Sequence, residues 1–172
     1  LLPGETLTRS AQTGTTSPGA FAQRLVSVSG GAGVTAAASA GATVRTYQFT
    51  VSQTAAGQTS SSNGFVSTNP NIGAITGAGS LTIRIGTTTT TVTPTFSSAT
   101  NAKEALEAVA TAVNAAGIDA RAQVVSANGA STLAITRQTT GSTSTMTIGG
   151  GLATPLGFTT TTAARDASYT LN

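Results

Sequence analysis

Hydrophobic and polar positions alternate with a period of two in several short runs of this chain. The clearest run, SLTIRIG at residues 80–86, sets Leu81, Ile83 and Ile85 against polar neighbours. This alternation is typical of a strand with one buried face. Similar but weaker alternation, or a run of β-branched residues, predicts further strands over residues 25–29, 41–53, 87–96, 118–125, 131–138 and 144–150.

A single segment, TNAKEALEAVATAVNAAG at residues 100–117, has a helical period instead. Asn101 can cap this helix, with Glu104 at the third helical position in a capping-box arrangement, and Gly117 can end it. Apolar residues fall at positions i, i+3, i+4 and i+7 on one face, namely Leu106, Val109, Ala110 and Val113. Because only one face is apolar, the helix needs a sheet to cover it.

Asn114 is a polar residue near the end of the same helix. Its amide could contact a ligand, but we expect it to tie the helix end to a neighbouring loop. The sequence therefore singles out a structural motif and no reactive group: Asn101, Glu104, Leu106, Val109, Val113, Asn114 and Gly117.

The strand and helix patterns together predict an α+β fold that is predominantly β, with two small β-rich domains. Residues 1–23 read as an irregular lead-in, and residues 58–78, rich in Gly, Ser and Asn, read as a linker. Residues 24–57 with 160–172 are expected to form a discontinuous β-rich domain. Residues 79–158 would be an inserted module with one helix packed on an antiparallel sheet.

Composition narrows the possible functions. The 172 residues contain five acidic and eight basic residues, with no Cys and no His. The basic residues are scattered and few aromatic rings accompany them, so we expect no nucleic-acid binding. Without His and Cys, the commonest general base, metal ligands and thiol nucleophile are missing. We therefore expect no enzyme activity, no catalytic residue, no cofactor and no metal site.

Two further features support that expectation. The close acidic pair, Glu104 and Glu107, lies on the first turns of the helix, where negative charge favours the helix dipole. No run of eighteen apolar residues occurs, so we expect no membrane insertion. Because the chain does not begin with Met, we expect it to be a piece of a longer protein.

The ordered succession of these segments resembles the hook-associated family of bacterial flagellar filament-capping proteins, including their hook IN-type module. Three stretches carry the resemblance, LTIRIGTTTTTVTPT, TNAKEALEAVATAVNAAGIDARAQVV and STLAITRQTTGSTSTMTI. The family has Ile-Asn where this chain has Val113-Asn114, and Gly-Val-x-Ala where it has Gly117-Ile118-Asp119-Ala120. The flanks, residues 24–57 and 163–172, resemble the strands on either side of the module.

The resemblance implies an extracellular structural protein of the flagellum. Such a protein forms an oligomer at the filament tip and helps flagellin subunits assemble, so its partners would be copies of itself and flagellin. Two alternatives stay open. The chain could be a variable outer domain of a flagellin, or an adhesive module that binds host surface glycans through a Thr-rich β surface.

Overall fold

The computed structural model describes residues 6–10, 27–29, 36–38, 43 and 45–172. The chain divides into two compact units. Unit 1 comprises Leu1–Thr54 and Asp166–Asn172, and unit 2 comprises Ala55–Arg165. Unit 1 is therefore discontinuous in sequence, and unit 2 is inserted within it.

Unit 1 contains an antiparallel four-stranded sheet in the order β12-β3-β1-β2. Its strands are β1 (Thr6–Ser10), β2 (Ser27–Ser29), β3 (Phe49–Gln53) and β12 (Ser168–Leu171). The expected lead-in at residues 1–23 thus includes a strand, because β1 pairs with both β2 and β3. The remainder of that lead-in, residues 1–5 and 11–23, lies outside the described residues.

The larger sheet of unit 2 is built around β9 (Ala130–Arg137). The strand β8 (Ala120–Ala127) pairs with β9 on one side through a hairpin that turns at Asn128 and Gly129. Both turn residues have positive φ, 50° and 77°, the conformation that a two-residue Asn-Gly hairpin turn requires. On the other side β9 pairs with β4 (Thr59–Ser61) and then β5 (Phe65–Val66), and β11 (Thr159–Thr162) extends the sheet beyond β4.

The smaller sheet of unit 2 has the order β10-β6-β7 and is also antiparallel. It consists of β6 (Leu81–Ile85), β7 (Thr88–Val92) and β10 (Thr147–Gly149). Leu81 and Ile83 are fully buried or nearly so, whereas Arg84 is exposed. The alternation read from residues 80–86 therefore corresponds to the buried and exposed faces of β6.

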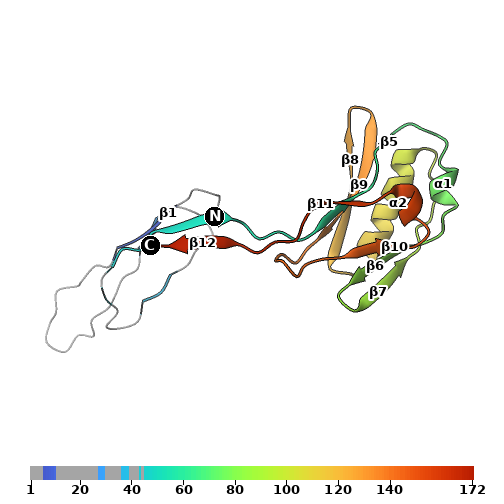
Figure 1. Ribbon diagram of the computed structural model, residues 1–172. Coiled ribbons are helices and arrows are strands. Elements are labelled where there is room, and N and C mark those ends of the chain that lie inside the picture. The colour runs from blue at the N-terminus through green and yellow to red at the C-terminus, as the bar shows by residue number, and fades with distance from the viewer. Residues whose placement is uncertain (1–5, 11–26, 30–35, 39–42, 44) are drawn as a thin grey trace. The chain divides into compact units, whose positions relative to one another are not determined.

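One long helix, α2 (Ala102–Ala115), packs against β8 and β9, as Figure 1 shows. Its apolar face and both sheets enclose the core of unit 2, which includes Leu106, Val109, Leu133 and Ile135. Two four-residue helices, α1 (Gly73–Thr76) and α3 (Ala153–Leu156), were not expected from the sequence. They add Ile75 and Leu156 to the core, together with Leu152, which immediately precedes α3. The expected α+β, predominantly β fold is confirmed.

The segment expected to be a linker, residues 58–78, belongs to the fold of unit 2. It carries β4, β5 and α1, and β4 also pairs with β11, which the sequence had placed in the other domain. The reason is chemical: the polar residues Gln58, Ser60 and Ser62, typical of loops, are buried here because each has hydrogen-bond partners.

Candidate functional site

The N-terminus of α2 is held by side-chain hydrogen bonds. Asn101 has an extended backbone, with φ −147° and ψ 171°, and its Oδ1 accepts a hydrogen bond of 3.1 Å from the Glu104 N–H. This satisfies one of the N–H groups that the first turn of a helix leaves without a partner. Asn101 is thus the N-cap of α2.

Glu104 completes the cap in a way that differs from the expected capping box. Its carboxylate accepts from the backbone N–H of Thr100 at 2.7 Å and from the Thr100 hydroxyl at 2.8 Å. In the expected arrangement it would accept from the N–H of the cap residue itself. The hydrogen bond from the Thr100 backbone is the main cause that lowers the pKa of Glu104, because it stabilises the ionised carboxylate.

The apolar face of α2 is buried against the sheets. Leu106, Val109 and Val113 have no exposed surface. These three residues are structural, since all their side-chain surface is used in the core of unit 2.

The C-terminal end of α2 is attached to strand β8 by Asn114. The Asn114 Nδ2 donates to the carbonyl oxygen of Ala122 at 2.9 Å, and the Ala122 N–H donates to Asn114 Oδ1 at 2.9 Å. Asn114 therefore ties the helix end to a strand, whereas the sequence suggested a loop. Gly117, with φ of +65°, follows the last helical residues and turns the chain towards β8.

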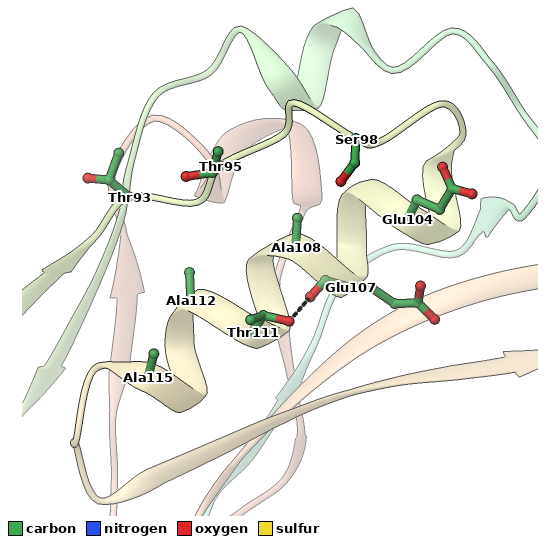
Figure 2. Close-up of a pocket in the computed structure, with 9 residues that line it drawn as sticks. All are labelled: Thr93, Thr95, Ser98, Glu104, Glu107, Ala108, Thr111, Ala112 and Ala115. Atoms are coloured by element: carbon green, nitrogen blue, oxygen red, sulfur yellow. Dashed lines mark hydrogen bonds between the residues drawn. The ribbon is translucent and has the colours of Figure 1, made fainter.

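The solvent-facing side of α2 forms one wall of a groove of about 620 Å³, drawn in Figure 2. The segment between β7 and α2 forms the other wall. Its lining combines hydroxyls, small apolar side chains and two carboxylates: Thr93, Thr95, Ser98, Glu104, Glu107, Ala108, Thr111, Ala112 and Ala115. Both charged residues of the lining are acidic.

Three polar side chains of this groove are engaged in local interactions. The Thr111 hydroxyl donates to the Glu107 backbone carbonyl at 2.9 Å, the contact dashed in Figure 2. The Glu107 carboxylate lies 3.3 Å from the Lys103 ammonium, and the Glu104 carboxylate is held by Thr100. The groove thus offers an open contact surface of hydroxyls, small apolar side chains and carboxylates. In the described part of the chain, no group of three or more His, Cys, Asp or Glu could hold a metal ion.

An ion pair at the open end of the β8–β9 hairpin was missed from the sequence. Arg137, which is 8% exposed, lies 2.7 Å from the Asp119 carboxylate and donates to the Thr145 carbonyl at 3.1 Å. Asp119 also accepts from the hydroxyl and the backbone N–H of Thr139, and the hydroxyl is the main cause that lowers the pKa of Asp119. The hairpin register could have indicated the pair, since Ala120 lies opposite Arg137.

Gln58 is a second structural residue that the sequence did not reveal. Its Oε1 accepts from the Met146 N–H at 2.9 Å, and its Nε2 donates to the Met146 carbonyl at 2.9 Å. Because Met146 immediately precedes β10 and Gln58 immediately precedes β4, this side chain joins the two sheets of unit 2. No local sequence signal identifies such a long-range contact.

Solved structures of a flagellar cap protein have the same fold. The D1-D2-D3 domains of FliD from Escherichia coli match with a TM-score of 0.54 and 25% identity over 73% of this chain. This chain is similar to the cap protein FliD. The D2-D3 domains of E. coli FliD match over 77% of this chain, with a TM-score of 0.54 and 22% identity. Those from Serratia marcescens match over 73%, with a TM-score of 0.54 and 23% identity.

The similarity extends over most of the two-domain FliD structures. The chain covers 73% of the E. coli D2-D3 chain and 72% of the S. marcescens one. It covers 40% of the E. coli D1-D2-D3 chain. No protein-family model matches the sequence, and no curated protein matches it either. Among the helices of the described residues, none has the length and hydropathy that a membrane crossing requires.

Proposed function

We propose that this chain forms outer domains of a bacterial flagellar filament cap. In this proposal, copies of the protein associate at the filament tip, outside the cell, and assist the assembly of flagellin there. The role is structural and involves no catalysis. The observation that carries the proposal is the shared fold with FliD D2-D3 domains from two organisms, which covers about three quarters of both partners in each comparison.

The two units fit this proposal as parts of the cap. We propose that unit 2 corresponds to the hook IN-type module, with α2 and its Asn114 contact at its centre. Unit 1 would be the domain into which this module is inserted. The alternatives of a flagellin outer domain and of a glycan-binding module gain no support from the structural comparisons.

Immunogold electron microscopy tests the proposal. Antibodies raised against the purified chain would be applied to flagellated cells that produce the protein, with cells lacking its gene as control. A cap predicts gold particles at filament tips only. Label along the whole filament would indicate a flagellin instead, and label on the cell surface away from filaments would refute a flagellar role.

Self-association can be tested separately in solution. The mass of the purified chain would be measured by light scattering over a wide range of concentrations. We expect the mass to grow from one chain towards an oligomer as concentration rises. A mass that stays that of one chain throughout would show that these residues do not supply the contacts between copies.

A further inference from the structure

The strand β8 forms one edge of the larger sheet of unit 2. It pairs with β9 over its whole length, from Ala120 opposite Arg137 to Ala127 opposite Ala130, and among the described strands it has no partner on its other side. Figure 1 shows β8 beside β9, with β5 on the opposite side of β9. The open side of such a strand presents backbone N–H and C=O groups that can pair with another chain.

The hydrogen bonds identify which residues of β8 direct their backbone groups to the open side. Ala122 does so, because its N–H and C=O bind Asn114 and not β9. In an antiparallel pair, alternate residues direct both groups to the same side, so Val124 and Ser126 face outward as well. Leu133, opposite Val124, agrees with this register: its N–H and C=O bind Ser62, on the far side of β9.

Asn114 makes the same two bonds that a residue of an added strand would make. A carboxamide has one C=O acceptor and N–H donors, as a peptide group has, and here it accepts from and donates to a single residue of β8. A pair of residues in neighbouring antiparallel strands exchanges bonds in this way. Beyond Ala122, the exposed residues Val125, Ser126 and Ala127 leave the rest of the edge open to solvent.

The edge of β8 is compatible with pairing to the β8 of a second copy. If two copies pair in antiparallel fashion about Val124, then Val124 faces Val124, and Ala122 of each copy faces Ser126 of the other. Arg121, the single charged residue of β8, then lies opposite Ala127, so no like charges oppose each other. In both copies the Asn114 carboxamide binds the backbone N–H and C=O of Ala122. This blocks two of the three outward pairs, the two in which Ala122 of one copy faces Ser126 of the other.

We propose that Asn114 protects the edge of β8. Its carboxamide occupies the position of a peptide group in an added strand, and so prevents β8 from pairing with the β8 of a second copy. With the edge of β8 protected by Asn114, copies of the chain can associate only through other surfaces. This inference does not depend on a role in the flagellum. Its tests compare the association of variants with that of the unaltered chain.

Sedimentation velocity of the 172-residue chain tests whether Asn114 prevents the pairing of β8 between copies. The Asn114→Ala variant frees both backbone groups of Ala122, so two more residue pairs can form between copies. We expect its association constant to exceed that of the unaltered chain by about tenfold or more. The matched control, Asn101→Ala, weakens the same helix at its other end without touching β8, and should associate as the unaltered chain does. An Asn114→Ala variant that is folded by circular dichroism and associates no more than the unaltered chain would overturn the proposal.

A second variant shows whether β8 is the surface involved. Proline at position 124 removes an outward N–H that β9 does not use, which is the kind of position where an edge strand accepts proline. Adding Val124→Pro to Asn114→Ala should return association to the level of the unaltered chain. Undiminished association of the double variant would place the new contact elsewhere and refute the proposal.

Hydrogen exchange on the unaltered chain provides a test that needs no variant to fold. The Ala122 amide, bonded to Asn114, should exchange more slowly than the outward Val124 amide by at least about tenfold. Equal exchange rates would show that Asn114 does not protect the edge of β8, and the proposal would be rejected.

Discussion

One leucine side chain from each unit shows a difference in surroundings. In unit 2, Leu106 of α2 has no exposed surface, whereas in unit 1 Leu171 of β12 is 56% exposed. Exposure is described in unit 1 for residues 36–38, 43, 45–54 and 166–172; among these Val51 is the one buried hydrophobic residue, and the other buried hydrophobic residues belong to unit 2. Tyr169, beside Leu171 on β12, is also 62% exposed and stacks on Phe49 with ring centroids 4.7 Å apart.

This difference indicates that the units are stabilised in different ways. Unit 2 buries the apolar face of α2 against its larger sheet, so its stability depends mainly on apolar burial and packing. The described strands of unit 1 are joined by backbone pairing and a few cross-strand contacts. Substitutions that remove apolar groups should therefore lower the free energy of unfolding of unit 2 much more than that of unit 1.

The largest contrast is expected between two identical substitutions. Leu106→Ala should lower the free energy of unfolding of unit 2 by about 3 kcal/mol, because it leaves a cavity in a closed core. Leu171→Ala should change stability by less than about 0.5 kcal/mol, because solvent already reaches that side chain. Urea unfolding followed by circular dichroism measures both. Equal losses would show that Leu171 is covered to the same extent as Leu106.

The Asp119–Arg137 pair tests whether polar contacts also matter in unit 2. Asp119→Asn leaves the guanidinium of Arg137 buried without its carboxylate partner. Because the Asp119 side chain is itself 37% exposed, we expect a moderate loss of about 1–2 kcal/mol at neutral pH. Urea unfolding of the variant beside the unaltered chain measures the loss. No change in stability would show that water replaces the carboxylate without cost.

The same substitution has a predictable pH dependence. The folded-state pKa of Asp119 lies below the ordinary value of 3.8, so ionised Asp119 stabilises the folded state above that value. This stabilisation is lost as pH falls through the folded-state pKa and the carboxylate takes up a proton. The difference in stability between the unaltered chain and Asp119→Asn should therefore be constant near neutral pH and shrink below about pH 4. A difference that persists unchanged in acid would point to a packing effect instead of charge.

Local sequence signals predicted the parts of unit 2 whose cause is local. The helix lies between Asn101 and Gly117 because capping and left-handed glycine are properties of single positions. The alternation in β6 and β9 is likewise visible in a short window. The strand β4 was missed because Thr59–Ser61 are polar, and their pairing with β9, including the hydrogen bond between the Thr59 and Thr136 hydroxyls, is not visible in any short window of the sequence. The strand β5 was missed because its two residues, Phe65 and Val66, are too few to show a period.

The candidate site follows the same division. The sequence indicated that Asn114 would tie down the helix end, since a polar residue there needs a partner. Its partner Ala122 could be identified only once the register of β8 was known, because the next residue of the strand directs its backbone groups to β9. The groove of Figure 2 depends on the path of the segment that precedes α2. The Thr and Ala residues that line the groove form no sequence pattern that predicts it.

A smaller effect is expected at the helix cap. Asn101→Ala removes the acceptor for the Glu104 N–H and should cost about 1 kcal/mol. Asn101→Asp, which retains a carbonyl-type acceptor and adds negative charge at the helix N-terminus, should cost much less. Urea unfolding of the two variants compares them directly. Equal losses would mean that the amide is needed for some contact other than capping.

The smallest effect is expected at the exposed ion pair on α2. Lys103 and Glu107 lie one helical turn apart, 3.3 Å between charged atoms, and both side chains are about half exposed to solvent, at 48% and 49%. Solvent and salt screen such a pair, so Lys103→Gln should cost no more than about 0.5 kcal/mol at low salt. Raising the ionic strength to about 1 M should remove the difference between the two proteins. A larger loss that salt does not reduce would mean that the Lys103 side chain stabilises α2 by packing, and that the solvent-facing side of the helix contributes to unit 2 as the buried side does.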